Sequence, residues 1–141
     1  MIGQKWFEMI YKNEPEADAN VLKFIAEFVY HNGEAGKETI ISLFTNGYCW
    51  YFSHILQSAF QRGNVCYVYD EHHFVWVDDN GVKYDINGVY HSWRPLIPED
   101  ELKDGVLEYM HVPGKNPVST EPEIVKRMMD YIELEEQTCT Q

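Results

Sequence analysis

The sequence predicts an α+β domain of 141 residues, with helices first and a small antiparallel sheet after them. Two observations predict this class. Residues up to about Gln61 carry apolar side chains at helical spacing, whereas the chain from Asn64 onward has short runs rich in β-branched and aromatic side chains. Helices followed by a meander of strands are typical of α+β domains. We expect one domain over residues 1–141, with a frayed tail from about 135.

Three helices are expected in the first half of the chain. The first runs from about Pro15 to His31, with Asn13 as its cap and the proline in its first turn. A shorter helical stretch lies around Glu38 to Phe44. The third helix runs from Tyr48 to Gln61, between the breakers "TNG" and "RGN". The apolar stripe of the first helix consists of Ala17, Val21, Leu22, Ile25, Phe28 and Val29.

The second half of the chain predicts strands. The segments "VCYVYD", "HFVWVD" and "VKYDI" form at least three antiparallel strands, and "DNG" is the turn between the last two. "HSWRPLIPEDELKDG" is expected to be a loop with a short helix, and "VLEYMHV" a further strand. A final amphipathic helix from about Glu121 to Leu134 is expected, with a capping box formed by Thr120 and Glu123.

The chain is strongly acidic, with a formal net charge of −12. Such a charge repels nucleic-acid backbones and anionic membranes, so we expect neither as a partner. A protein or peptide substrate, particularly a basic one, suits this charge better. The alternative interpretation is that the charge only keeps the domain soluble.

Cysteine usage and the N-terminus indicate a cytoplasmic protein. The cysteines at 49, 66 and 139 are odd in number and have no zinc or disulfide spacing, which fits a reducing compartment. We see no signal peptide in "MIGQKWFEMIYKNE" and no apolar run long enough to span a bilayer. Cys66 is expected in the core and Cys139 in the tail. No cofactor is expected.

The stretch "NGYCWYFSHIL" sets Cys49 at the start of the third helix. A helix from Tyr48 to Gln61 is about 20 Å long, and a strand from Asn64 to Asp70 covers about 20 Å as well. If the strand packs antiparallel to the helix, the chain returns to the level of Cys49 near His73. The sequence therefore predicts a histidine beside the cysteine.

The next hairpin can supply a carboxylate. With a three-residue turn Asp79-Asn80-Gly81, Val75 faces Asp85, so His73 and Asp85 share one face as diagonal neighbours. A two-residue Asn80-Gly81 turn would move Asp85 to the other face. Both turns remain open at this point.

These residue types suit nucleophilic catalysis. Only the thiolate of a cysteine attacks a carbonyl, and a helix N-terminus and an adjacent imidazolium both stabilise it. The imidazole then protonates the leaving group, while a carboxylate orients the ring. Backbone amides at the start of the Cys49 helix, with Asn46 as a side-chain donor, are candidates for an oxyanion hole.

"NGYCWYFSHIL" followed by "HFVWVDDNGVKYDING" resembles small bacterial and phage proteins of the papain-like, or transglutaminase-like, cysteine hydrolase clan. The resemblance implies a papain-like core, with the cysteine-bearing helix packed on the sheet. It also implies that Cys49 is the nucleophile, His73 the base and Asp85 the orienting acid. The implied activity is hydrolysis of a peptide, isopeptide or side-chain amide through a thioester, with deamidation or acyl transfer as variants of the same chemistry.

Other interpretations stay open. Cys49 could be an ordinary buried thiol, and His72 is the alternative base, since adjacent strand residues point to opposite faces. A metal site joining the two histidines with Asp70, Glu71 or Asp78 lacks a second ligand cluster, so no metal is expected. His54 lies off the helical face of Cys49 and is expected to be structural. The rival function is a non-catalytic acidic protein, possibly encoded by a phage, that binds and inhibits a basic factor.

Overall fold

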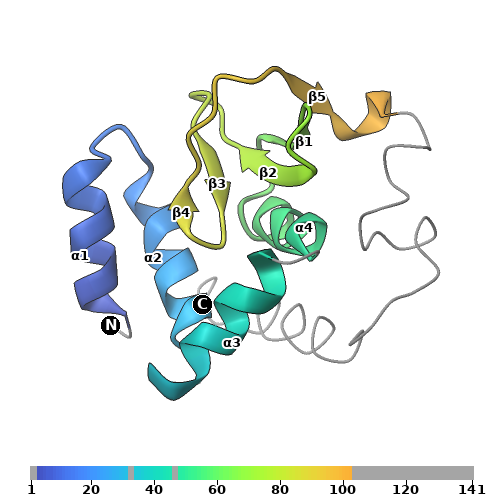
Figure 1. The fold of residues 1–141 in the computed structure, drawn as a ribbon. Helices are drawn as coiled ribbons and strands as arrows, with labels where there is room; N and C mark the ends of the chain where they lie inside the picture. The colour runs from blue at the N-terminus through green and yellow to red at the C-terminus, as the bar shows by residue number, and fades with distance from the viewer. Residues whose placement is uncertain (1–2, 32–33, 46–47, 103–141) are drawn as a thin grey trace.

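The structure is a computed structural model that describes residues 3–31, 34–45 and 48–102. This part of the chain is α+β, as expected: helices precede an antiparallel sheet with strand order β4-β3-β2-β1-β5 (Figure 1). The helices are α1 (Gln4–Asn13), α2 (Ala19–Val29), α3 (Glu34–Thr45) and α4 (Cys49–Phe60). The strands are β1 (Asn64–Val68), β2 (His73–Val77), β3 (Lys83–Asp85), β4 (Gly88–Val89) and β5 (Leu96–Pro98), followed by the 3₁₀ helix η1 (Glu99–Glu101).

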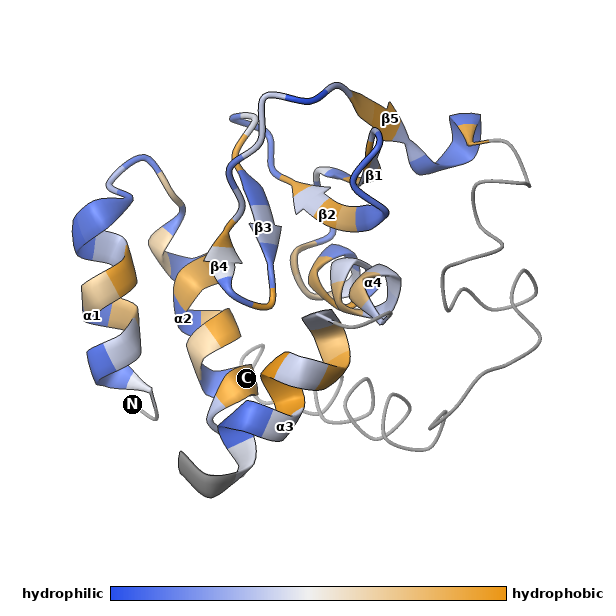
Figure 2. Ribbon diagram, in the orientation of Figure 1, coloured by the Kyte–Doolittle hydropathy of each residue, from blue (hydrophilic) through white to orange (hydrophobic). Residues whose placement is uncertain are grey.

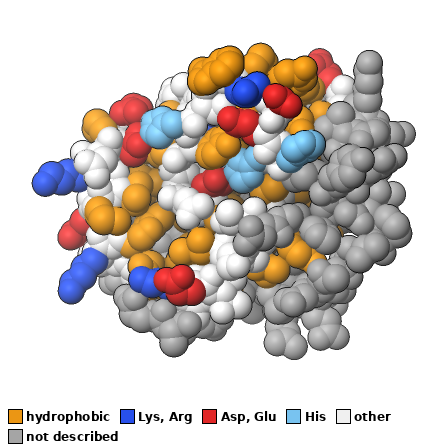
Figure 3. Space-filling view, viewed as in Figure 1, with side chains coloured by type: hydrophobic (Ala, Val, Ile, Leu, Met, Phe, Trp, Pro, Cys, Tyr) orange, Lys and Arg blue, Asp and Glu red, His pale blue; other side chains and the backbone are white. Residues whose placement is uncertain are grey.

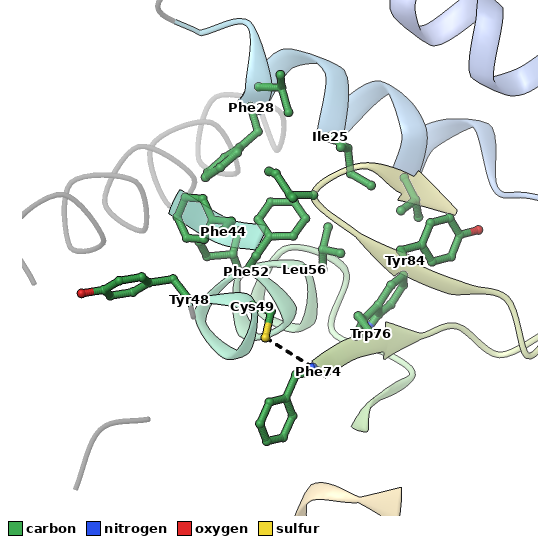
Figure 4. Packing of buried hydrophobic residues seen from close by; sticks show 14 of the residues in the cluster. Ile25, Phe28, Phe44, Tyr48, Cys49, Phe52, Leu56, Phe74, Trp76 and Tyr84 are labelled. Carbon is green, nitrogen blue, oxygen red and sulfur yellow. Dashed lines mark hydrogen bonds between the residues drawn. The ribbon is translucent and has the colours of Figure 1, made fainter. Parts of the chain in front are cut away.

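The core lies between α4 and the sheet. Helix α4 packs on β1 and β2, while α2 contacts α1 and α3 (Figure 1). Apolar stripes on these helices meet in the interior (Figure 2). Aromatic rings from α2, α3 and α4 pack together at the centre in tilted and edge-to-face arrangements, with Phe28, Phe44 and Phe52 at centroid distances of 5.1 to 5.7 Å (Figure 4). This core fixes α4 against β2 and so fixes the position of Cys49.

The first predicted helix was wrong in its bounds. Asn13 ends α1 instead of capping the next helix, and α2 begins only at Ala19. The cap is Asp18, whose carboxylate accepts from the Asn20 N–H over 2.8 Å. Helix α1, which the sequence analysis missed, is amphipathic but contributes no fully buried residue. The expected helix around Glu38–Phe44 is confirmed within α3.

The strands agree with the sequence up to Asp85 and depart from it afterwards. The expected loop after Tyr90 contains the short helix η1, but also strand β5, which pairs with β1. The short strand β4 was missed too. The expected strand at 106–112, the helix at 121–134 with its capping box, the tail and Cys139 lie outside the described residues. Within the described part of the chain, no helix is long and apolar enough to cross a membrane.

The β2–β3 hairpin has the three-residue turn. Trp76 pairs with Tyr84, and the Asp78 N–H donates to the Val82 carbonyl over 3.0 Å. Gly81 has φ +84°, the left-handed conformation that this turn needs. The two-residue alternative is thereby excluded, and Asp85 lies in the register that brings it to the face of His73.

The buried carboxylate of Asp78 stabilises this register. It is 5 % exposed, and its Oδ1 accepts from the backbone N–H groups of Asn80 and Val82. Its Oδ2 accepts from the Tyr84 hydroxyl over 3.0 Å. Tyr84 in turn accepts from the Asp18 N–H over 2.8 Å, so one network joins the hairpin turn to the start of α2.

Candidate functional site

Cys49 is the first residue of α4, directly after the N-cap Tyr48. Its side chain is nearly enclosed, with 3 % of the residue exposed. The Phe74 backbone N–H of β2 donates to the sulfur over 3.4 Å (Figure 4). The first N–H groups of a helix have no acceptor within the helix, and the helix dipole favours negative charge there. The sulfur therefore lies at the N-terminal end of α4, beside a backbone donor of β2.

His73 and Asp85 form a hydrogen-bonded pair across the hairpin. His73 Nε2 lies 3.0 Å from Asp85 Oδ2. The other carboxylate oxygen of Asp85 accepts from the Asn87 N–H over 2.8 Å, which fixes the orientation of the carboxylate. Both side chains are largely buried, at 13 % and 9 % exposed.

The protonation of His73 depends on both Asp85 and Cys49. Burial by itself lowers the pKa of His73, but hydrogen bonds to Asp85 and Cys49, together with the negative charge of both groups, raise it from 6.5 to about 9. His73 is thus an imidazolium at neutral pH. Because Nε2 is engaged by Asp85, Nδ1 is the ring nitrogen that remains for the sulfur. The structure therefore brings all three residues that the sequence singled out into one chain of contacts.

Tyr90 completes the surroundings of the histidine and was missed by the sequence analysis. Its ring centroid lies 4.7 Å from that of His73, tilted by 50°. Its hydroxyl donates to Glu71 Oε2 over 2.8 Å. Tyr90 directly follows β4, a two-residue strand with no pattern of its own, so no local signal pointed to it.

The remaining site predictions have different outcomes. Asn46, the candidate side-chain donor for an oxyanion hole, lies outside the described residues. His72, the alternative base, is exposed, and its Nδ1 lies 3.4 Å from the Tyr67 hydroxyl. His54 is paired with Glu99 over 2.9 Å, and Glu99 also accepts from the Trp50 indole N–H over 2.7 Å. His54 therefore has the structural role that was expected of it.

The residues considered for a metal site are engaged in other contacts. Glu71 binds the Tyr90 hydroxyl, Asp70 forms an ion pair with Arg94 over 3.1 Å, and Asp78 holds the hairpin turn. Among the described residues, no group of three or more histidine, cysteine, aspartate or glutamate side chains is arranged to hold a metal ion.

Cys66 differs from Cys49 in its surroundings. It is buried in β1, as expected. Burial raises the pKa of the Cys66 thiol, and the negative charges of Asp100 and Glu99 raise it further. A thiol of this kind is a poor nucleophile at neutral pH. Cys66 is thus a natural internal reference for the reactivity of Cys49.

Comparison with known proteins identifies one family that this chain matches. A family model described as phage YunG-like protein matches residues 21–113, about two-thirds of the chain. The match includes α4 and every strand of the sheet, and therefore all three residues of the candidate site. The search of curated proteins and the search of solved structures gave no match.

Proposed function

The chain belongs to the phage YunG-like protein family, and we propose that it is a thiol hydrolase with a papain-like, or transglutaminase-like, core. Cys49 is the nucleophile, His73 the general acid and base, and Asp85 the residue that orients the imidazole. The substrate is a protein or peptide, and the acidic chain favours a basic one. The bond cleaved is a peptide, isopeptide or side-chain amide.

The observation that carries this proposal is the chain of contacts from sulfur to imidazole to carboxylate. Hydrogen bonding of this kind is what thiol catalysis requires, because the base must reach the nucleophile and must itself be oriented. An ordinary core cysteine has no need for a buried imidazolium beside it. Burying that charge is costly unless it is paired.

The reaction follows from these positions. The Cys49 thiolate attacks the carbonyl carbon, and the N–H groups at the start of α4 stabilise the oxyanion. The C–N bond breaks while His73 gives its Nδ1 proton to the leaving amine, which leaves a thioester on Cys49. Water, deprotonated by the neutral His73, then attacks the thioester. This step releases a carboxylic acid and restores the thiolate and the imidazolium.

The test is the rate at which iodoacetamide alkylates Cys49 between pH 5 and 10. Trypsin separates the three cysteines into different peptides, so mass spectrometry follows Cys49 and Cys66 in the same sample. We expect Cys49 to react readily at pH 6 and His73→Gln to slow this reaction about tenfold or more. His72→Gln is the matched control and should leave the rate unchanged. If Cys49 reacts only above pH 8 and both variants behave alike, the proposal fails.

A second function is favoured by a different observation. Cys49 is only 3 % exposed, and the chain carries a net charge of −12. Acidic side chains lie beside histidines on the face in Figure 3, in keeping with that charge. These features suit an acidic binding protein on a papain-like scaffold that has lost its catalysis and that inhibits a basic partner. Cys49→Ala discriminates the two functions, because a surface inhibitor keeps its biological effect and a hydrolase loses it.

A further inference from the structure

We propose that Glu71 and Tyr90 act together as positioning residues for His73: the tyrosine ring rests on the imidazole, and the Glu71 carboxylate holds that ring in place. The inference rests on the proposed function, because it assigns these residues to the thiol–imidazole site. Tyr90 contacts the imidazole directly and Glu71 acts on it through Tyr90, so both are assigned to positioning the ring and not to the bond-making steps.

Tyr90 is held by hydrogen bonds at its backbone and at its hydroxyl. Its backbone N–H donates to the Lys83 carbonyl over 2.8 Å, which anchors the residue beside β3. Its hydroxyl donates to Glu71 Oε2 over 2.8 Å. Burial, followed by the hydrogen bond to Glu71 and the charge of that carboxylate, raises the pKa of Tyr90 above its usual range. The phenol is therefore a hydrogen-bond donor throughout the neutral range.

Both carboxylate oxygens of Glu71 accept hydrogen bonds from the segment after β4. Oε2 accepts from Tyr90, and Oε1 accepts from the Ser92 hydroxyl over 3.2 Å. The Ser92 hydroxyl oxygen also accepts from the Arg94 N–H over 3.1 Å. A single carboxylate thus ties this segment to the turn that leads into His73.

That turn is strained and needs such support. Asp70 and His72, the two neighbours of Glu71, have φ values of +64° and +48°. Left-handed conformations at residues other than glycine cost on the order of 1 kcal/mol each and persist only where the surroundings enforce them. Within the turn, the Glu71 N–H donates to the Val68 carbonyl over 3.1 Å. The contacts of Glu71 across to Tyr90 and Ser92 help to hold the conformation from which His73 enters β2.

Two neighbours therefore restrain the His73 ring. Asp85 holds the edge of the ring at Nε2, and the Tyr90 ring packs against it at a tilt of 50°. The His73 and Asp85 side chains are only 13 % and 9 % exposed, so their hydrogen bond is largely shielded from solvent. A hydrogen bond shielded from water is electrostatically stronger than an exposed one.

Two measurements test the inference: the pH profile of Cys49 alkylation, and the NMR titration of the His73 imidazole. Tyr90→Leu removes the ring and should slow alkylation at pH 6 about tenfold, with a lower midpoint for His73. Tyr90→Phe keeps the ring and loses only the hydroxyl, so we expect a loss of about fivefold, the value of one hydrogen bond. Glu71→Ala removes the same bond and also the bond from Ser92, so its loss should equal or exceed that of Tyr90→Phe. The double variant Tyr90→Phe/Glu71→Ala should be no slower than Glu71→Ala, because the Tyr90 bond is already absent there.

Tyr30→Phe is the matched control. It also removes a tyrosine hydroxyl from a hydrogen bond, the one that Lys37 Nζ donates to it over 3.5 Å, but at the end of α2, away from the hairpin and from the turn before His73. It should leave both profiles unchanged. If Tyr90→Leu fails to fold, the comparison of Tyr90→Phe with Glu71→Ala carries the test alone.

The outcomes separate this inference from the proposed function. Wild-type profiles in Tyr90→Leu, with His73→Gln still slowing alkylation, would overturn the positioning role and leave the hydrolase proposal standing. Losses that multiply in the double variant would overturn the pairing of Glu71 with Tyr90. If His73→Gln has no effect on alkylation, the proposed function fails. An unchanged His73 titration in Tyr90→Leu would then overturn the positioning role independently.

Discussion

Asp85 lies across the β2–β3 hairpin from His73 and receives its Nε2 hydrogen bond over 3.0 Å, while its second oxygen is held by the Asn87 N–H. This pair supplies the buried positive charge beside Cys49. It also makes the Asp85 carboxylate one of the groups that keep His73 protonated.

Removing the charge of Asp85 should lower the pKa of His73. In Asp85→Asn the burial of the ring remains and disfavours the imidazolium, while its negative partner is lost. We expect the imidazole midpoint, followed by NMR, to fall from about 9 to near or below 6.5. Alkylation of Cys49 at pH 7 should slow about tenfold or more. Asp79→Asn, in the same hairpin but with its side chain 66 % exposed, is the control; equal behaviour of the two variants would contradict the prediction.

Stability should depend on pH through His73. Its pKa is raised on folding, so its contribution is complete below about pH 6.5 and is lost as pH rises through about 9. A rise from 6.5 to about 9 corresponds to roughly 3 kcal/mol. Urea denaturation at pH 6 and pH 9.5 should therefore show a loss of this order in the wild type relative to His73→Gln. The same pH dependence in both proteins would refute the assignment.

The proposed hydrolysis should decline on the alkaline side. The leaving amine needs a proton from the imidazolium, which His73 loses as pH rises through about 9. With an amide substrate in hand, we expect the rate to fall above that pH in the wild type. In Asp85→Asn the fall should begin at a lower pH. A rate that keeps rising to pH 10 would indicate that His73 is not the proton donor.

Asp78→Ala should be strongly destabilising although it lies away from the sulfur. The change leaves two backbone N–H groups and the Tyr84 hydroxyl without their acceptor in a buried place. A cost of about 2–4 kcal/mol in the free energy of unfolding is expected from urea denaturation. It also frees the hairpin to adopt the two-residue Asn80-Gly81 turn, so the His73–Asp85 pair should weaken. Asp79→Ala is the neighbouring control, with an expected change close to zero.

Two glycine substitutions should differ in cost. Gly81 and Gly63 both have left-handed backbone conformations, with φ +84° and +72°. An added Cβ at Gly81 meets nothing within 4 Å, so Gly81→Ala should cost about 1 kcal/mol from backbone strain alone. At Gly63 the same atom would lie 2.2 Å from the Val77 carbonyl oxygen, so the strand must shift. Melting temperatures should rank the wild type above Gly81→Ala and Gly81→Ala well above Gly63→Ala.

The elements that carry the candidate site could be predicted because their signals are local. The Asp79-Asn80-Gly81 turn and the strand alternation beside it set the register of Asp85. The breakers around α4 set Cys49 at a helix start. The choice between the two possible turns needed Asp78, however, and its burial depends on Tyr84 and the start of α2, which no local pattern reveals.

The parts that were missed depend on distant partners. Asp18, and not Asn13, caps α2, and Asp18 is also held by Arg62, 44 positions along the chain, over 2.6 Å. Strand β5 contains a proline and forms only by adding to the free edge of β1. The sequence suggested Glu71 only as a possible metal ligand, because its role beside the histidine depends on Tyr90, a residue beyond three further strands.

The proposed catalytic groups come from one uninterrupted stretch of the chain, which begins at Cys49 and ends at Asp85 and contains only α4, β1, β2 and β3 with short connections. No group has to be supplied by a remote part of the sequence. The stretch can therefore be inherited as a single cassette. Genetic exchange on either side of it would leave the nucleophile and its base on one segment, although Tyr90, which contacts His73, lies just beyond it.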